Sequence, residues 1–368
     1  MKKKLLLTLT VFILMILSVF SVSAAEKTVI LKGVTYELTE NKADGKFYRV
    51  RSFFDYEHKD ITEEIIIAEK INDIPVLSVD VRFDKEVPNE ENYSVKKIIL
   101  PEGLKYIEDY ALSNFKGVKT ISLPSTLVRI DFGGMSGMDS LKSITLPKSL
   151  TKVGEKAFDG CESLSKVVFK GKVTSIGSNA FAYCTSLKKI TLPDSLKKLG
   201  AGAFRGSGLV SVTVPEKTDV ASPEIFRDCK KLKKVIFDGC KRKKGLELGT
   251  RMFYGCNSLK SVSLPKESKE IKIGYEAFRG CKAFTSFTVI SEVSKIGEKA
   301  FYGCTKLKKV TFENSKTVPA IGKKAFVKTA KEIKFVAENK KTATALKKKI
   351  KATGIKKPNV GYVKYVKV

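Results

Sequence analysis

Large hydrophobic side chains recur along this chain about every 23 residues. A period of this size is typical of a solenoid, whose coils must stack because each is too small to bury its own apolar face. We expect the recurring side chains to form one buried file, each phenylalanine contributing roughly 1.5–3 kcal/mol on burial. The recurring position is held by Leu112, Met135, Phe158, Phe181, Phe204, Phe226, Phe253, Phe278, Phe301 and Phe326.

A second apolar pattern begins six residues after the recurring hydrophobe and alternates as a strand does, for example at Leu187, Ile190 and Leu192. A proline such as Pro193 then ends the strand. An aliphatic–glycine pair such as Ile176–Gly177 follows, where glycine suits either a positive φ or a close backbone approach. The sequence predicts a mainly β repeat solenoid with one long parallel sheet.

These motifs resemble the BspA-like leucine-rich repeats of bacterial surface proteins. Cys184–Pro193 matches their pattern C-x-x-L-x-x-I-x-L-P, and Ile176–Gly177 and Ala180–Phe181 precede it at the matching positions. The resemblance covers about residues 61–336. It implies a leucine-rich-repeat, right-handed superhelix that is secreted or displayed on a bacterial surface and often acts as an adhesin.

The N-terminus has the features of a secretory signal peptide, predicted to end at residue 24. Three lysines precede an apolar run and the small residues Val22, Ser23 and Ala24. A membrane anchor is the alternative, because the run is long enough to span a bilayer. No later segment is as apolar, so we expect no transmembrane span after cleavage and an extracellular or cell-surface location.

Both ends of the repeat region are expected to be capped. Residues 25–60 predict a β-hairpin cap, and residues 337–368 predict a basic cap with a short helix and a final strand. The basic end has an alternative role as an electrostatic tether. The acidic insertion from Asp80 to Ser94 is interpreted as a solvated loop rather than a calcium site, because its spacing matches no known ligand pattern.

Lysine is concentrated at two adjacent positions that open each strand, on a chain of net charge +30. The candidate ligand-binding residues are Lys96, Lys97, Lys119, Lys142, Lys166, Lys188, Lys189, Lys233, Lys234, Lys260, Lys308 and Lys309, and the same spacing assigns Lys331 to the first position. Outward hydroxyls are predicted beside them at Ser122, Thr145, Thr191, Thr213, Ser263, Thr288 and Thr311. This surface is either a solvated face that resists aggregation or a binding face for an extended anionic partner.

Seven cysteines in an exported chain raise the possibility of disulfides. Six occupy one repeat position, which Ser207 and Thr329 fill in other coils. Stacked coils would hold these side chains parallel, so we expect free, buried thiols. Cys240 lies outside the repeat register beside basic residues and is the candidate reactive thiol.

The sequence gives no support for catalysis. The single histidine, His58, has no metal-type spacing and is interpreted as a surface residue, and no catalytic triad, carboxylate pair or phosphate loop is evident. We therefore expect a monomeric adhesin or interaction protein without cofactor or metal, whose partner is a host surface or matrix protein, or an anionic glycan or wall polymer. The absence of Trp and the scarcity of Arg argue against sequence-specific nucleic acid binding. The alternative is a wall-associated structural protein held by its charge.

Overall fold

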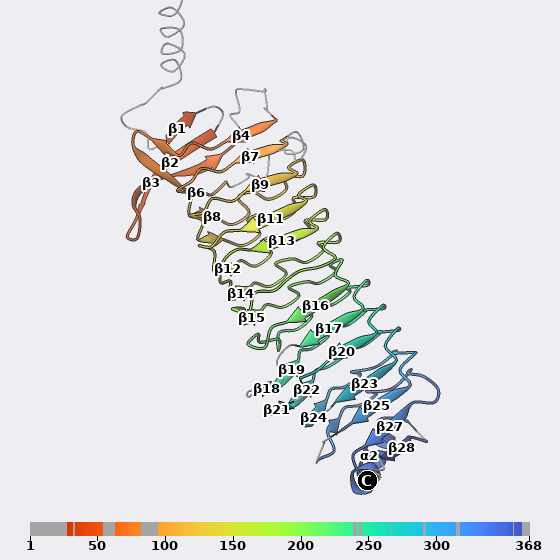
Figure 1. Ribbon diagram of the computed structural model, residues 1–368. Coiled ribbons are helices and arrows are strands. Elements are labelled where there is room, and N and C mark those ends of the chain that lie inside the picture. The colour runs from red at the N-terminus through yellow and green to blue at the C-terminus, as the bar shows by residue number, and fades with distance from the viewer. Residues whose placement is uncertain are drawn as a thin grey trace, which may run out of the picture.

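The protein is an elongated stack of coils with a β-hairpin at one end and a helix at the other (Figure 1). The computed structural model describes residues 28–31, 34–53, 63–81, 95–237, 241–242, 245–265, 267–289, 292–313, 317–355 and 357–362. The predicted solenoid is confirmed. None of the helices in these ranges has the length and apolar character needed to cross a membrane.

Most coils place one strand on the same flank of the stack, which we call the strand face (Figure 1); the coil containing Ile190 has only an isolated bridge there, from Lys189 to Ser211. The strands of this face run parallel, as predicted, but their pairing is interrupted after β9, after β13 and after β20. The strands are β4 (Glu64–Ile66), β7 (Lys97–Ile99), β9 (Thr120–Ser122), β11 (Ser143–Leu146), β13 (Lys166–Phe169), β16 (Ser211–Val214), β17 (Lys234–Phe237), β20 (Ser261–Ser263), β23 (Ser286–Val289), β25 (Lys309–Phe312), β27 (Lys334–Ala337) and β28 (Asn359–Tyr362).

A second column of parallel strands, which the sequence did not predict, runs along another flank of the coils. Its strands are β6 (Ile74–Val79), β8 (Tyr106–Ile107), β10 (Arg129–Ile130), β12 (Lys152–Val153), β14 (Ser175–Ile176), β15 (Lys198–Leu199), β19 (Leu246–Leu248), β22 (Ile271–Ile273), β24 (Val293–Ile296) and β26 (Ala320–Ile321). From β12 onward, each of its strands ends at the aliphatic residue that precedes a repeat glycine. Many of the strands have only two residues, which is too short for an alternating pattern to reveal them.

The glycines that follow this second column permit close backbone approach between coils. A Cβ atom on Gly177 would lie 2.6 Å from the backbone nitrogen of Glu155, and one on Gly154 would lie 2.3 Å from the carbonyl oxygen of Ile130. Neither glycine has a positive φ. Close approach, rather than turn geometry, is therefore the reason for glycine at these positions.

The predicted phenylalanine file is confirmed. The ring centroids of Phe158 and Phe181 lie 5.3 Å apart, those of Phe181 and Phe204 lie 5.7 Å apart, and both pairs are nearly parallel. Stacking continues coil by coil to Phe326. Because the phenylalanines of the file are buried, the file forms the centre of a single apolar core.

The first coils are covered by an antiparallel meander of β1 (Thr28–Leu31), β2 (Val34–Asn41) and β3 (Gly45–Ser52). Strand β3 pairs in parallel with β6, so the hairpin continues the second column. The buried hydroxyl of Tyr36 accepts a hydrogen bond of 3.0 Å from the Ala68 amide. Three short strands complete the sheets: β5 (Lys70–Ile71), β18 (Lys241–Arg242) and β21 (Glu267–Ser268).

The last coil is closed by helix α2 (Lys340–Ala352), which lies between β27 and β28 in the chain, as the sequence predicts. Asn339 caps its first turn by accepting a hydrogen bond of 2.9 Å from the Thr342 amide. Leu346 and Ile350 are buried against the core. The structure therefore covers the terminal apolar layer, as a solenoid requires.

Candidate functional site

The lysine row, defined here as the twelve candidate lysines, lies on the strand face, and every one of its side chains is exposed. Backbone hydrogen bonds tie the row together from coil to coil, including those from the Lys142 amide to the Lys119 carbonyl (3.1 Å) and from the Lys260 amide to the Lys233 carbonyl (2.9 Å). The structure therefore brings these charges together along one flank, as the spacing predicts.

The last coil departs from the predicted row. Strand register pairs Lys309 with Lys334, whereas Lys331 precedes β27 and lies outside the row. The assignment of Lys331 was wrong because this coil is longer than 23 residues, which displaces the strand relative to the repeat. Thr311 also differs from the prediction: it is only 3 % exposed, whereas its register neighbour Thr288 is exposed.

Much of the row is electrostatically uncompensated. Lys97 forms an ion pair with Glu64. In contrast, no carboxylate among the described residues lies within 4 Å of the ammonium groups of Lys188, Lys189, Lys308 and Lys309. Exposed charges of one sign along a single face produce a positive field that attracts anions and weakens with salt.

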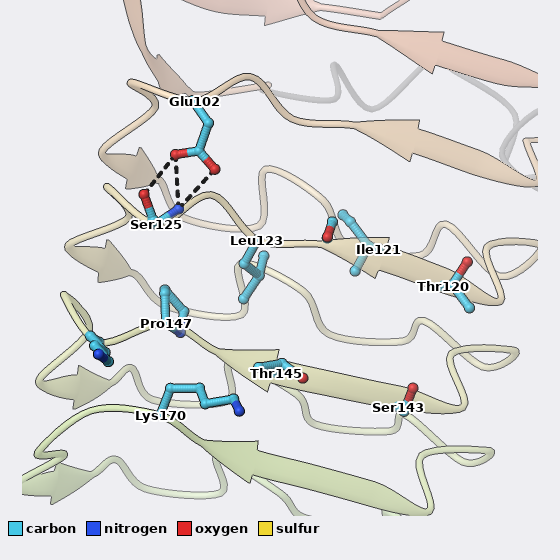
Figure 2. Close-up of a pocket in the computed structure, with 11 residues that line it drawn as sticks. Glu102, Thr120, Ile121, Leu123, Ser125, Ser143, Thr145, Pro147 and Lys170 are labelled. Carbon is cyan, nitrogen blue, oxygen red and sulfur yellow. Dashed lines mark hydrogen bonds between the residues drawn. The ribbon is translucent and has the colours of Figure 1, made fainter.

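A groove of about 540 Å³ lies on the strand face between β9 and β11 (Figure 2). Its centre is lined by the outward side chains of Thr120, Ser122, Ser143 and Thr145. In the register of the adjoining strands, Thr120 lies opposite Lys97, and Ser143 lies opposite Lys166. The groove lies where two successive coils carry short hydroxyl side chains in place of lysine, and Ser261 and Ser286 of β20 and β23 are another such pair.

The floor and rims of the groove differ in chemistry. Ile121 and Pro147 are buried and provide an apolar floor. At one rim, Glu102 accepts hydrogen bonds from the Ser125 amide (3.0 Å) and the Ser125 hydroxyl (2.8 Å). Lys170 lies across the groove from Glu102 in Figure 2, and Lys148 also lines it. The site thus combines hydroxyls, an apolar floor and ammonium groups.

A ladder of arginine and tyrosine side chains, which the sequence analysis missed, occupies the position directly after four successive core phenylalanines, from Phe226 to Phe301. The guanidinium of Arg279 lies 5.6 Å from the ring centroid of Tyr254 and 5.1 Å from that of Tyr302. Arg227 lies 5.1 Å from the centroid of Tyr254 on the neighbouring coil. The signal was available, because Arg227, Tyr254, Arg279 and Tyr302 alternate at one repeat position.

Glu276 anchors this ladder. Its side chain is only 1 % exposed and accepts a hydrogen bond of 2.8 Å from Arg251 Nε and another from Arg279. Burial raises the pKa of Glu276, but the hydrogen bonds from these arginines outweigh burial, and the pKa lies below its usual value. The ladder is therefore a fixed network of stacked and paired charges.

The six repeat-position cysteines are free and buried, as predicted. Each thiol donates to the carbonyl of the recurring hydrophobe in the preceding coil, as Cys184 does to Phe158 (3.2 Å) and Cys229 to Phe204 (2.9 Å). Burial raises the pKa of Cys161 and of Cys229 to about 12. These thiols are therefore neutral structural donors.

In the described part of the chain, no group of three or more histidine, cysteine or carboxylate side chains is placed so that it could hold a metal ion. Some predictions fall outside that part and are not tested. These are the signal peptide, His58, the reactive thiol Cys240 and nearly all of the acidic insertion.

The comparisons identify the repeats. Six copies of the model described as "BspA type Leucine rich repeat region" match residues 90–182, 156–272 and 242–349, which is more than half of the chain. The chain belongs to this family. No curated protein matches it.

Solved structures share the architecture at low sequence identity. The pneumococcal vaccine antigen PcpA is 20 % identical, with a TM-score of 0.51, covering 94 % of this chain and 100 % of its own. A leucine-rich repeat protein from Bacteroides ovatus is 23 % identical, with a TM-score of 0.47, covering 91 % and 100 %. A leucine-rich cell surface protein from Faecalibacterium prausnitzii is 14 % identical, with a TM-score of 0.40, covering 94 % and 97 %. This likeness concerns the fold alone.

Proposed function

We propose that this chain is an exported, cell-surface binding protein without catalytic activity, which uses the strand face to hold an extended anionic partner. The observation that carries the proposal is the exposed lysine row, whose backbones are fixed coil by coil. Strands of one sheet lie about 4.8 Å apart, so the row presents closely spaced charge to a long ligand. A host surface or matrix protein with acidic stretches, or an anionic glycan, fits such a face.

The test is a binding array of matrix proteins and glycans against residues 25–368, at rising salt. The variant changes Lys188, Lys189, Lys308 and Lys309 to serine. We expect about a tenfold or greater loss of binding for the captured partner, because affinity that depends on charge contacts falls steeply when several are removed.

The matched control removes four exposed lysines elsewhere: Lys197, Lys198, Lys230 and Lys231. Both variants lose four positive charges, so a partner that binds the strand face specifically will bind the control variant more tightly than the lysine-row variant. Equal binding by the two variants would exclude a role for the lysine row.

A second candidate function is retention on the anionic cell wall of the producing bacterium. Helix α2 favours it, because Lys340, Lys341, Lys347, Lys348 and Lys351 are exposed at the end of the stack. For this candidate, the chain would be released from stripped walls at moderate salt and would bind no host protein. Changing the exposed lysines of α2 to glutamine would then release it, while the strand-face variant would remain attached.

A further inference from the structure

We propose that the groove between β9 and β11 binds an acidic sugar, namely a sugar ring that carries a carboxylate. This inference rests on the proposed function and deepens it by placing one ligand residue at one point on the strand face. Two kinds of molecule carry such a sugar: a host glycan with sialic or uronic acid, and a uronic acid polymer of the bacterial wall.

The hydroxyl lining supplies the first argument. Thr120, Ser122, Ser143 and Thr145 each carry a group that both donates and accepts hydrogen bonds, and all four are exposed. Sugar hydroxyls need both donors and acceptors. The groove volume, about 540 Å³, falls within the range of about 300–1,000 Å³ that small-ligand sites occupy.

The floor supplies the second argument. Ile121, Leu123 and Pro147 line the groove beneath the hydroxyls. One face of a sugar ring is covered by C–H groups, which pack on apolar side chains while the ring hydroxyls reach the polar walls. A flat inorganic anion, or an extended peptide that contacts only the lysines, would make no contact with this apolar floor.

Charge supplies the third argument and sets the orientation. Both Lys148 and Lys170 line the groove and are exposed. The sugar carboxylate is placed at these ammonium groups, which are drawn to a compact anion. Glu102 lies at the other rim, held by Ser125, and would repel the carboxylate while accepting a sugar hydroxyl.

Other coils of the same chain supply substitutions that the fold already accepts. Ile99 and Val168 occupy the outward position that Ser122 and Thr145 hold in β9 and β11. The double variant S122I/T145V therefore fills the groove with side chains that neighbouring coils of this chain already carry at the same position. The double variant T120K/S143K likewise copies Lys97 and Lys166, and it adds two positive charges.

The experiment measures binding of 3′-sialyllactose, a hyaluronan tetrasaccharide and a teichuronic acid fragment to residues 25–368 by calorimetry, with lactose as the neutral comparison. We expect the acidic probes to bind more tightly than lactose. Preference for sialyllactose or hyaluronan indicates a host source, and preference for the wall fragment indicates the bacterial source.

The variants distinguish a specific binding site in the groove from non-specific electrostatic attraction, because the two cases predict opposite changes in affinity for T120K/S143K. Both S122I/T145V and T120K/S143K should weaken binding of the acidic sugar by about tenfold or more, although the second raises the positive charge. If binding were only electrostatic, T120K/S143K would strengthen it. Changing Lys148 and Lys170 to glutamine should reduce the acidic probe to the affinity of lactose.

The matched control is S263I/T288V, because β20 and β23 are another pair of successive coils with outward hydroxyls at both positions. It should bind the acidic sugar as the natural chain does. Unchanged binding by S122I/T145V, or equal loss in the control, would overturn the assignment. Failure of the groove variants to affect a long polyanion leaves the proposed function standing, because that function depends on the whole lysine row.

Discussion

Phe204 offers the most direct test of the stacked core. Its side chain is fully buried, and its ring centroid lies 5.7 Å from that of Phe181 and 5.8 Å from that of Phe226. Replacing a buried phenylalanine by alanine costs about 3–5 kcal/mol through lost burial and the cavity left behind. Because this ring stacks on both sides, we expect F204A to lie in the upper half of that range.

The effect should be local as well as large. Stability in a solenoid is approximately the sum of coil terms and nearest-neighbour interfaces. Urea unfolding should therefore show the loss of free energy, and hydrogen exchange should show faster opening of the coils around Phe181, Phe204 and Phe226. Protection of the coil containing Phe326 should change much less.

The control is F204L, since Leu112 occupies the same position of the file near the N-terminus. Leucine keeps most of the volume and should cost about 1–2 kcal/mol. An F204A variant that loses less than about 1 kcal/mol, or that opens all coils equally, would refute the description of the core as a file of locally coupled rings.

Three further predictions concern the buried polar groups. C184S should cost less than about 1 kcal/mol in chemical denaturation, because serine also donates to the Phe158 carbonyl, whereas C184V leaves that carbonyl with only the 3.3 Å hydrogen bond from the Cys161 amide and should cost about 0.5–1.5 kcal/mol more than C184S; a valine variant as stable as the serine variant would contradict the thiol hydrogen bond. Glu276 has a lowered pKa, so its contribution to stability is present above its usual value of 4.5 and is lost as pH falls through the folded pKa. E276Q should therefore reduce the free energy of unfolding at pH 7 by about 1–3 kcal/mol and make it less dependent on pH in the acidic range. An unchanged pH dependence in that range would contradict this role of Glu276. The six repeat-position thiols should resist a thiol reagent at pH 8 until the chain unfolds, as followed by mass spectrometry, because all six are buried and burial raises the pKa of Cys161 and of Cys229 to about 12; modification in the folded state would show that the thiols are accessible.

The inward positions were predictable because stacking repeats the same requirement in every coil. The phenylalanine file and the cysteine position follow from a spacing that survives most of the chain. Residues at the cysteine position use their side chains in hydrogen bonds: Cys229 donates to the Phe204 carbonyl of the preceding coil, and Thr329 donates to the Phe326 carbonyl of its own coil. In Ser207, the hydroxyl contacts the Cys229 sulfur at 3.4 Å. A small hydrogen-bonding side chain is all that the site requires.

The features that the sequence analysis missed depend on contacts and strand lengths that the repeat spacing does not reveal. Strands as short as Lys152–Val153 carry too few residues to alternate, so the second column was invisible. The lengthened coil before β27 moved the register from Lys331 to Lys334. The pairing of Glu276 with Arg251 joins different coils, which no local pattern shows.

In the function proposed above, the outward positions carry the binding chemistry, because stacking leaves them free to vary. Repetition alone would place a lysine at each strand opening, and Lys97, Lys166 and Lys189 follow that rule. Thr120 and Ser143 break it in two successive coils, as Ser261 and Ser286 do further along the chain, and the groove lies at the first of these breaks. In a molecule whose core is the same in every coil, a ligand can be positioned along the axis only by such departures from the repeat. In this proposed function, the lysine row supplies attraction along the whole face, and the groove supplies the register in which a long ligand is held.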